Sequence, residues 1–464
     1  MFRLSDIQTH RSESDCWIAI HGNVTNFLTH HPGGKAIILQ HAGTDATAAF
    51  EDVHPAELLD EYLASDQLLG TLESTAGPQN VTTRRAIENN APPLPTILSL
   101  AEMEALALQH LPPKALAYYA SGTDDEITKT ANGVIFKSIL LRPRVFINCA
   151  NCSLSTTILG NHVGLPVFVS PAAMAKLAHP SGEAGIASAC SGLNALQIIS
   201  KNASMSVPDI VRAGPDAVFA WQLYVLKDLV ATERTLAHIK TIPQIKFIVL
   251  TLDAPFPGKR EADERFKAAE VAAGTAPPHQ VWGTEAGLTW TKTLSWLRKH
   301  TDLPIVLKGI QTHEDAYLAM KHYPAVRGII LSNHGGRALD TACTPMQVLM
   351  EIRKFCPEVL GKLEVLVDGG VKRGTDVVKA LALGARGVGI GRAALYGLSV
   401  GGEGGVRRSL EILADEVATA MRLLGAEKLD DLGPQHVNTA ALNLLLYDGL
   451  PPRGEVEGAM KARL

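Results

Sequence analysis

Eight short apolar runs, each followed by a stretch of helical periodicity, occupy residues 166 to 391. Runs of this length between turn residues are typical of strands buried on both faces of a sheet. Eight strand–helix repeats in one segment predict an α/β fold, a closed (β/α)8 TIM barrel, in place of an open sheet. The eight predicted strands are Pro166–Ser170, Leu196–Ser200, Ala217–Tyr224, Lys246–Asp253, Pro304–Gly309, Gly328–Ser332, Val365–Gly369 and Gly387–Gly391.

Polar and small residues gather where these predicted strands end. In a (β/α)8 barrel the C-terminal ends of the strands form one face, and that face carries the chemistry. The residues at these ends are Pro171, Ala172, Ala173, Ser200, Gln222, Tyr224, Thr251, Asp253, Lys308, Ser332, His334, Arg337, Asp368, Gly369, Gly370, Lys372, Gly391 and Arg392. We therefore expect them to surround a single site.

The last two strand ends have the composition of a phosphate site. Glycine turns at Gly369-Gly370 and Gly391 expose backbone N–H groups, and Lys372 and Arg392 add positive charge. Plain tight turns are the alternative interpretation. No Gly-x-Gly-x-x-Gly followed by an acidic residue occurs in a strand–helix–strand setting, so the sequence predicts no nicotinamide dinucleotide site.

The stretch Ser332–Asp340 carries the most reactive combination in the chain. His334 lies three residues before Arg337, just after a predicted strand. An imidazole accepts a proton near neutral pH, and a guanidinium binds a carboxylate through two parallel hydrogen bonds. The pair therefore indicates proton abstraction from a carboxylic acid substrate, although a histidine after a strand is often only structural.

Residues 1–72 form a separate, small α+β unit in front of the barrel. Cys16–Ile20 is predicted as a strand, Gly22-Asn23 as a turn and Lys35–Gln40 as a helix. Two histidines, His31 and His54, stand at turns with helical segments between them. This arrangement lets two neutral imidazoles face each other across a flat cofactor, as in the axial ligation of haem iron.

Residues 73–95 form a Pro- and Gly-bearing linker, and residues 96–464 carry the barrel and a C-terminal tail. The net charge of −4 makes nucleic acid an unfavourable partner, and no apolar run is long enough to span a membrane. We expect the six cysteines to be reduced thiols, since Cys149 and Cys152 lack a second pair for zinc. We therefore expect an intracellular, soluble protein, and we see no signal or transit peptide in the sequence.

The terminal tripeptide Ala462-Arg463-Leu464 is similar to a peroxisomal targeting signal, so the expected compartment is cytoplasmic or peroxisomal. A chance tripeptide is an equal alternative.

The N-terminal unit resembles the cytochrome b5 family. The resemblance rests on His31-Pro32-Gly33-Gly34, Ala42–Thr47, Phe50 and His54. It implies haem b with His31 and His54 as axial ligands to the iron. Val24–Phe27 follows the turn directly, where the family usually has about three more residues. A degenerate domain that has lost haem is the alternative.

From Thr96 to about Tyr447 the chain resembles the FMN-dependent α-hydroxyacid oxidase and dehydrogenase family. The motifs that carry the resemblance are Tyr118–Gly122, Trp221–Val225, Leu250–Pro255, Gly258–Glu261, Leu307–Gly309, Ser332–Asp340, Asp368–Asp376 and Gly391-Arg392.

The resemblance implies a role for each matching position. His334 would be the active-site base, Asp253 would support its imidazole, and Tyr224 would hydrogen-bond the substrate hydroxyl. Arg337, with Tyr118 and Arg260, would bind the substrate carboxylate. The remaining residues would bind FMN, with Lys308 near the flavin N1/C2 carbonyl; they are Pro171, Ala172, Ala173, Ser200, Gln222, Thr251, Ser332, Asp368, Gly369, Gly370, Lys372, Gly391 and Arg392.

Three substitutions depart from this family pattern. Ala172 stands where the family usually has threonine, and Lys372 replaces a usual arginine, which keeps the charge without the planar fork. Asn202 occupies a position beside the substrate that is often large and apolar. We expect Asn202 to contact the substrate side chain, which puts a simple lactate preference in question. The segment from 261 to 287 is also short for a loop that covers the flavin.

Together the two resemblances imply an FMN- and haem-dependent dehydrogenase of an L-2-hydroxy acid similar to lactate. Electrons would pass from FMN to the haem and on to cytochrome c or a similar acceptor, and family resemblance implies a homotetramer. The main alternative is a peroxide-producing, glycolate-type oxidase with a vestigial haem domain. An electron carrier with an inert barrel and a different FMN barrel, such as an isomerase, are further alternatives.

Overall fold

The computed structural model describes residues 1–26, 35–51, 54, 59, 67–73, 92–272 and 284–447. The predicted haem ligand His31 and the terminal tripeptide Ala462-Arg463-Leu464 lie outside these residues. Within the described ranges, no helix is long and apolar enough to cross a membrane.

A closed barrel of eight parallel strands forms the centre of the larger domain, as the sequence predicted. All eight strands follow one another around the barrel in chain order, and β16 closes it by pairing with β9, with Val388 opposite Val167. The strands are β9 (Val167–Val169), β10 (Leu196–Ile199), β11 (Val218–Leu223), β12 (Ile245–Thr251), β13 (Ile305–Ile310), β14 (Val326–Leu331), β15 (Glu364–Asp368) and β16 (Gly387–Ile390).

Strand alternation divides the apolar residues between two cores. Inward-facing residues such as Phe168, Ile198 and Val249 fill the barrel, while their sequence neighbours, such as Ile199 and Leu250, pack outward against the helices. Because side chains alternate in direction with a period of two, the next inward-facing position after the apolar filling lies at the strand end. The functional residues therefore continue the inner face of the barrel.

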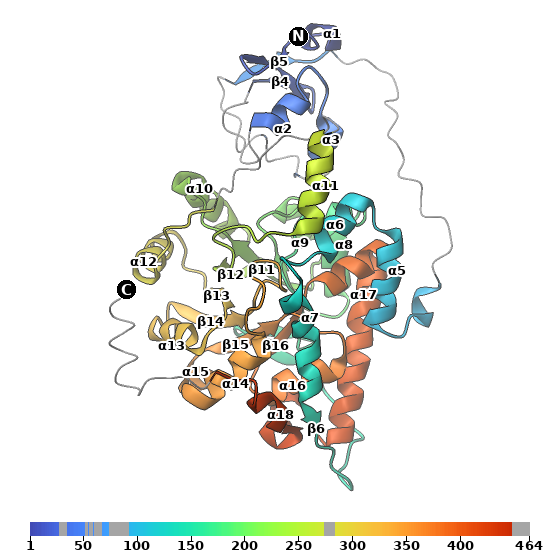
Figure 1. Ribbon diagram of the computed structural model, residues 1–464, viewed down its shortest axis with the longest axis vertical. Coiled ribbons are helices and arrows are strands. Elements are labelled where there is room, and N and C mark those ends of the chain that lie inside the picture. Colours follow the sequence, from blue (N-terminus) through green and yellow to red (C-terminus); the bar gives the residue numbers. More distant parts are fainter. Residues whose placement is uncertain are drawn as a thin grey trace.

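Helices cover the outside of the barrel (Figure 1). The helices between and after the strands are α8 (Gly182–Ser191), α9 (Val207–Ala213), α10 (Leu229–Lys240), α11 (Glu261–Ala272), α12 (Trp290–His300), α13 (His313–Lys321), α14 (Pro345–Phe355), α15 (Glu358–Lys362), α16 (Gly374–Ala382) and α17 (Arg392–Leu424). Helix α17 is kinked where Gly402 adopts a φ of +57°, which favours glycine.

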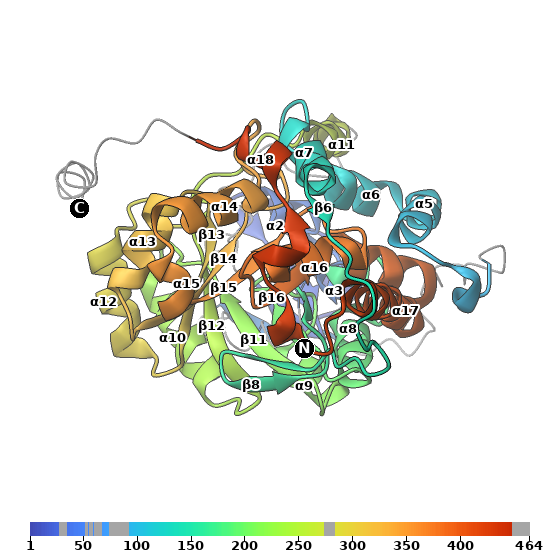
Figure 2. The ribbon, with the colours of Figure 1, turned by 90° about the horizontal axis from the view of Figure 1, so that it is seen from below.

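A helical segment precedes the barrel and packs on its side. It comprises α5 (Leu100–His110), α6 (Pro113–Ala120), α7 (Ile127–Val134) and the 3-10 turn η2 (Ile135–Ser138), followed by β6 (Leu140–Leu141). The hairpin of β7 (Thr156–Ile158) and β8 (Asn161–Val163) contributes Ile158 and Val163 to the inner core of the barrel. Seen from below, β8 lies in front of the strands in Figure 2.

The N-terminal domain has a three-stranded sheet and two small hydrophobic clusters, one of which contains Ile18 and Ile20 and the other Ala19. The sheet has the order β3 (Ile18–Ile20), β4 (Asn23–Thr25) and β5 (Leu68–Thr71). The predicted strand Cys16–Ile20 is divided, because β2 (Asp15–Cys16) pairs instead with β1 (Arg11–Ser12). Its helices are α1 (Leu4–Ile7), α2 (Lys35–Gln40) and α3 (Thr47–Glu51). Among the described residues, Lys176 Nζ of the barrel domain donates a hydrogen bond to the Glu51 carbonyl of the N-terminal domain at 3.2 Å.

We predict that Gly405→Ala lowers the free energy of unfolding by about 1–3 kcal/mol. A Cβ at Gly405 would overlap the carbonyl oxygen of Gly397, which the kink of α17 brings against it. Gly361→Ala is the matched control, because a Cβ there meets nothing within 4 Å and alanine favours its helix α15. Chemical denaturation of both variants measures the effect; equal stabilities would contradict the close approach.

Candidate active site

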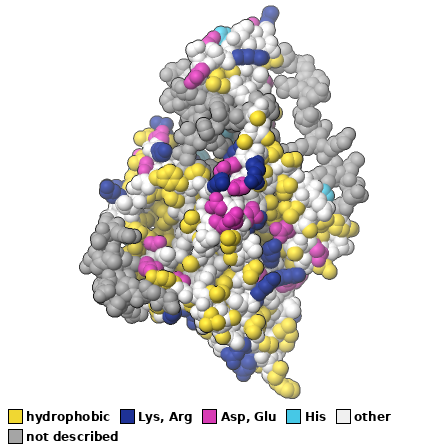
Figure 3. All heavy atoms as spheres, viewed as in Figure 1, with side chains coloured by type: hydrophobic (Ala, Val, Ile, Leu, Met, Phe, Trp, Pro, Cys, Tyr) yellow, Lys and Arg dark blue, Asp and Glu magenta, His cyan; other side chains and the backbone are white. Residues whose placement is uncertain are grey.

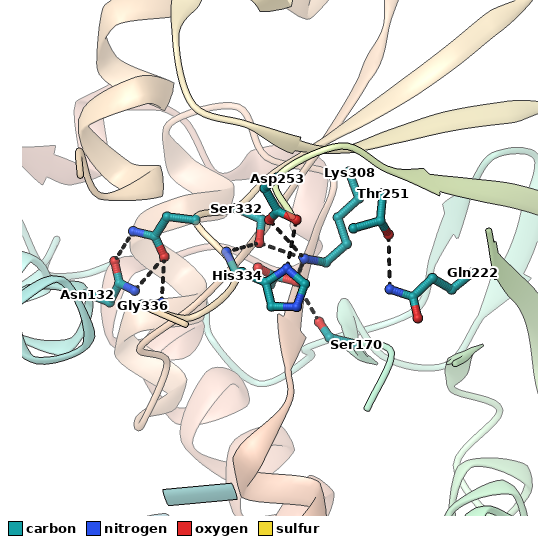
Figure 4. Close-up of polar contacts among 11 residues, drawn as sticks. Asn132, Ser170, Gln222, Thr251, Asp253, Lys308, Ser332, His334 and Gly336 are labelled. Atoms are coloured by element: carbon teal, nitrogen blue, oxygen red, sulfur yellow. Dashed lines mark hydrogen bonds and ion pairs between the residues drawn. The ribbon is translucent and has the colours of Figure 1, made fainter. Parts of the chain in front are cut away.

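His334 and Asp253 form a short polar contact at the C-terminal ends of the barrel strands. His334 follows β14 with a φ of 58°, and its backbone N–H donates to Ser332 Oγ at 3.1 Å. Its Nδ1 lies 2.7 Å from Asp253 Oδ1, and the carboxylate is fully buried, while the imidazole keeps 26% of its surface exposed. Figure 4 shows the two side chains pointing toward each other. Nε2 of His334 is left as the ring nitrogen for a substrate.

Lys308 is a buried cation between two carboxylates. Its Nζ donates to Ser332 Oγ at 2.8 Å and lies 3.7 Å from Asp253 Oδ2 and 3.6 Å from Asp368 Oδ2. Burial by itself would lower the pKa of Lys308, but the carboxylates of Asp253 and Asp368 outweigh it and raise that pKa above its usual value. Lys308 is therefore a fixed positive charge at neutral pH.

The carboxylate of Asp253 stays ionised because cationic neighbours outweigh the effect of burial. Burial would raise its pKa, but His334 and Lys308 lower it to about 2. Gly309 makes room for this carboxylate, because a Cβ at Gly309 would lie 2.6 Å from the Asp253 Cβ. The buried charge therefore depends on neighbours from β13 and β14.

Two guanidinium groups flank the ring of Tyr118. The guanidinium carbon of Arg337 lies 4.9 Å from the ring centroid and that of Arg260 5.2 Å. Arg337 Nη1 donates to the carbonyls of Tyr118 at 2.6 Å and Ser121 at 3.1 Å, and Arg260 Nη2 pairs with Asp263 Oδ2 at 3.1 Å. Burial, and then the charges of Arg260 and Arg392, lower the pKa of Arg337 to about 10. Arg337 thus remains charged at neutral pH in surroundings that favour an anion.

A hydrogen-bonded chain links the ends of β10, β11 and β12. Ser200 Oγ donates to Gln222 Oε1 at 3.1 Å, and Gln222 Nε2 donates to Thr251 Oγ1 at 3.0 Å. Tyr224 lies two residues after Gln222 on the same inward register; burial, then the charge of Asp253, raises its pKa. Its phenol remains protonated and is a hydrogen-bond donor.

The glycine turns at the last two strand ends are half-buried. Gly369 and Gly370 have φ values of +106° and +77°, and a Cβ at Gly370 would overlap the backbone of Asn132. A Cβ at Gly391 would meet nothing within 4 Å. Arg392 Nη2 donates to the Gly335 carbonyl, so its guanidinium reaches from β16 to the loop of His334.

Lys372 lies differently from the other predicted phosphate residues. Its Nζ is 2.7 Å from Glu104 Oε2 of α5, and 55% of its side chain is exposed. A phosphate ligand role for Lys372 therefore requires the side chain to leave Glu104. The two residues are far apart in sequence, and no local pattern pointed to this pair.

The loops after β9 and β10 lie against each other. The backbone N–H of Met174, which follows Pro171-Ala172-Ala173, donates to the Asn202 carbonyl at 3.1 Å, and the Asn202 side chain is exposed. Asn202 therefore lies where these two loops meet, and its contact with the side chain of a substrate stays a prediction.

Three polar residues of the site were not singled out from the sequence. Ser170 Oγ donates to Asp368 Oδ2 at 2.9 Å, and the side-chain amides of Asn132 and Asn333 exchange two hydrogen bonds of 2.8 Å (Figure 4). The strand-end position of Ser170 was a usable signal. Asn132 belongs to α7, outside the barrel repeats, so only the folded chain shows its place.

Of the two predicted haem ligands in the N-terminal domain, His54 is among the described residues. His54 follows α3, and its backbone N–H donates to the Phe50 carbonyl at 2.8 Å. The ring centroids of His54 and Phe50 lie 5.1 Å apart. The role of His54 as an axial ligand of haem iron stays a prediction. His31 lies outside the described residues, so the geometry of the pair is not defined.

We predict that Asp253→Asn lowers the free energy of unfolding by about 2 kcal/mol near pH 7. The pKa of Asp253 is lowered in the folded state, so its ionisation stabilises the fold above about pH 4 and this contribution is lost as the pH falls toward about 2. Urea unfolding at several pH values should show the gap between the two proteins narrowing below about pH 4. Asp415→Asn, an exposed position, is the control. A gap that is independent of pH would contradict the prediction.

Comparisons with known proteins identify both domains. Residues 107–439 match the FMN-dependent dehydrogenase family, and residues 3–73 match the cytochrome b5-like haem/steroid-binding domain. The L-lactate dehydrogenase (cytochrome) of Saccharomyces cerevisiae is 37% identical over 94% of this chain and 80% of its own length. Glycolate oxidase of Spinacia oleracea is 38% identical, but the match covers 74% of this chain and 95% of that protein.

The structural comparison agrees. The recombinant flavin-binding domain of baker's yeast flavocytochrome b2 superposes with a TM-score of 0.71 at 38% identity, covering 79% of this chain and 92% of that one. These matches agree with the closed barrel and with the polar residues at the ends of its strands. The chain belongs to the FMN-dependent dehydrogenase family and carries a cytochrome b5-like haem-binding domain in front of its catalytic barrel.

Proposed function

We propose that this protein oxidises an L-2-hydroxy acid similar to lactate to the 2-oxo acid and delivers the electrons to cytochrome c or a similar acceptor. FMN is the cofactor of the barrel and haem b that of the N-terminal domain. The contact of His334 with Asp253 carries the proposal, because it orients the imidazole as a base. Arg337, three residues after His334, supplies the group that binds a carboxylate. Similarity to L-lactate dehydrogenase (cytochrome) over both domains supports the haem-linked acceptor.

The strand ends fit a flavin phosphate and ring. The positive-φ glycines, Arg392 and Lys308 supply N–H groups and positive charge, and the Ser200–Gln222–Thr251 chain supplies uncharged hydrogen-bonding groups. When bound, FMN accepts two electrons from the substrate, and haem transfers single electrons to the acceptor. Lys308 provides the fixed positive charge where negative charge collects on reduction.

Oxidation of the substrate removes the hydrogen on its α-carbon and the hydrogen of its hydroxyl group, and His334 accepts one of these two as a proton. Its Nδ1 faces Asp253, so Nε2 is the site of protonation, and the ionised carboxylate stabilises the resulting imidazolium. Since Asp253 is buried and also close to Lys308, its charge is fixed in place before the substrate arrives.

The substrate carboxylate binds Arg337, with Arg260 and Tyr118 beside it. Arg337 is oriented by the carbonyls of Tyr118 and Ser121, and this fixed orientation suits a two-point contact with a carboxylate. The phenol of Tyr224 donates to the substrate hydroxyl. Asn202, exposed at the edge of the site, would contact the substrate side chain, so a substrate with a polar side chain is compatible with this wall.

Other features remain part of the proposal. We place the haem domain at residues 1–72, the linker at 73–95 and the barrel with its tail at 96–464. Self-association as a tetramer and a cytoplasmic or peroxisomal location follow from resemblance and from the terminal tripeptide.

A second candidate is a glycolate-type oxidase that gives electrons to O2. Its support is the 38% identity to spinach glycolate oxidase over the barrel. The N-terminal domain is outside that match. The presence of this domain favours the dehydrogenase function over the oxidase function.

We predict that His334→Gln slows flavin reduction by 2-hydroxy acids by about a hundred- to ten-thousand-fold. Loss of the base removes the proton acceptor, while Arg337 and the flavin site are retained. Anaerobic stopped-flow mixing measures flavin bleaching directly, and His162→Gln on the exposed hairpin is the matched control. Bleaching at the parent rate in His334→Gln would exclude His334 as the base.

We further predict that anaerobic mixing of the full chain with L-lactate gives reduced-haem absorption bands after flavin bleaching. A panel of other 2-hydroxy acids in the same experiment ranks the substrates by rate. The variant His54→Ala, which removes a predicted axial ligand, should bleach at the parent rate without reduced-haem bands. Absence of these bands in the parent, with peroxide formed in air, would favour the oxidase.

A further inference from the structure

Helix α7 precedes the barrel in the sequence and packs against the loop that carries His334. Asp340, in the same loop, accepts hydrogen bonds from the backbone N–H of Thr128 at 2.7 Å and of Ile127 at 3.2 Å. The backbone N–H of Ala342 donates in turn to Thr128 Oγ1 at 3.0 Å. The loop is therefore attached to the first turn of a helix that lies outside the barrel repeats.

The same helix contacts the loop a second time, one turn further on, through the side chain of Asn132. Asn132 Nδ2 donates to Asn333 Oδ1, and Asn333 Nδ2 donates to Asn132 Oδ1, both at 2.8 Å. The residues are 0% and 2% exposed. Figure 4 shows the Asn132 amide beside the loop of Gly336 and His334. Two reciprocal hydrogen bonds between buried amides fix both the distance and the orientation of these side chains.

Asn333 uses its whole hydrogen-bonding capacity in this position. Its Oδ1 also accepts from the Gly336 N–H at 3.2 Å, and its Nδ2 also donates to the Cys343 carbonyl at 3.1 Å. A side-chain amide has two acceptor sites and two N–H donors, so all four are occupied. A flipped amide would place like groups against Gly336 and Cys343, which excludes that orientation. Asn132 therefore faces an amide with one defined orientation.

The turn that carries His334 has a backbone conformation that needs support from outside. The three residues from 334 to 336 have φ values of 58°, 66° and 74°. A positive φ is uncommon for a residue with a side chain such as His334, and it persists only where surrounding contacts determine it. The Asn333 side chain supplies the contact with Gly336 inside the turn, and Asn132 holds that side chain from the helix.

Asn132 also lies beside the glycine turn that follows β15. A Cβ at Gly370 would lie 2.2 Å from the carbonyl carbon and oxygen of Asn132, so the backbone of α7 occupies the space next to that turn. Asp124 and Asp125, just before α7, are exposed instead. Figure 3 shows Asp and Glu side chains, with Lys and Arg side chains beside them, gathered near the start of α7. The contacts of α7 with the two turns therefore come from its backbone and from uncharged side chains.

We propose that Asn132 is a positioning residue for the reaction: through Asn333 it holds the turn that directs the imidazole of His334 toward Asp253. Asn132 belongs to a helix outside the barrel, so the barrel strands alone do not set the position of the base. This role rests on the proposed function, because it requires that His334 accepts a proton from the substrate.

Binding of the substrate carboxylate has a separate support. The guanidinium of Arg337 is oriented by the carbonyls of Tyr118 and Ser121, and neither of these belongs to the amide pair. Loss of the amide pair should therefore slow proton transfer much more than it weakens binding of a carboxylate.

The substitution Asn132→Asp tests the proposal, because a carboxyl group has the shape of the amide and its hydrogen-bonding character depends on pH. In its protonated form the introduced carboxyl donates to Asn333 Oδ1 and accepts from Asn333 Nδ2, as the amide does. In its ionised form it has no donor and places a negative oxygen against Asn333 Oδ1. No charged side chain hydrogen-bonds either amide within the described part of the chain. Burial therefore raises the pKa of the introduced carboxyl, and acid restores the pair.

We expect anaerobic flavin reduction in Asn132→Asp to be about 10- to 100-fold slower than in the parent at about pH 8 and within about threefold of the parent at about pH 5.5. The ratio at each pH removes the titration of His334, which both proteins share. Asn132→Ala, which cannot be protonated, should be slow at both pH values. The dissociation constant of pyruvate, measured by flavin absorbance, should change by less than about threefold in either variant.

Hydrogen exchange measured by mass spectrometry, without substrate, reports on the turn itself. Peptides that contain residues 333–337 should exchange faster in Asn132→Asp than in the parent at about pH 8, and at the parent rate at about pH 5.5. Gly405→Ala is the control for a general loss of stability, and Asn151→Asp, at an exposed position, is the control for the chemical change. Both controls should keep the pH profile of the parent. The Asn132→Asp protein is prepared in acid, where its carboxyl reproduces the amide, and flavin content after transfer to higher pH confirms that it remains folded.

A ratio of Asn132→Asp to parent that is the same at every pH would overturn the proposal, whether the rate is lost or retained. Unchanged hydrogen exchange of residues 333–337 in both Asn132 variants would also overturn it. Failure of the parent to be reduced by any 2-hydroxy acid would contradict the proposed function instead, and hydrogen exchange would then decide separately whether the amide pair holds the turn.

Discussion

The buried carboxylate of Asp253 is the charge on which the catalytic face depends. An isolated carboxylate in this position would cost several kcal/mol of desolvation, and its compensation comes from His334 and Lys308 on the two strands that follow. These strands, β12, β13 and β14, are consecutive both in sequence and around the barrel, so their ends meet. The same arrangement fixes a negative charge behind the imidazole and a positive charge beside Asp368. The folding and the chemistry of the site therefore share one set of contacts.

The polar residues occupy the face next to the apolar filling of the barrel because of strand geometry. Phe168 is followed two residues later by Ser170, Val306 by Lys308, and Ile330 by Ser332. Each pair lies on the same inward face of its strand. The apolar layer below excludes water and holds the strands rigid, so the layer above can keep its charges in fixed positions.

The catalytic face and the N-terminal domain make complementary contributions to the proposed function. The barrel supplies proton removal and carboxylate binding from its own residues, which agrees with its similarity to both dehydrogenases and oxidases. The cytochrome b5-like domain is what distinguishes this chain from the oxidases among the relatives considered. In the proposed function, the haem-linked electron acceptor therefore follows from the N-terminal domain and not from the site around His334.

The sequence by itself determined the barrel and most of the catalytic face. Eight apolar runs specify eight strands, and a period of two identifies which residue at each strand end points inward, so His334, Asp253 and Lys308 were predictable as neighbours. The tertiary structure alone decided contacts between distant segments. These include the Lys372–Glu104 ion pair, the Asn132–Asn333 amide pair and the exposure of Phe146. The reason is physical: periodicity fixes the direction of a side chain within its own element, whereas its partner depends on how the chain returns from far away.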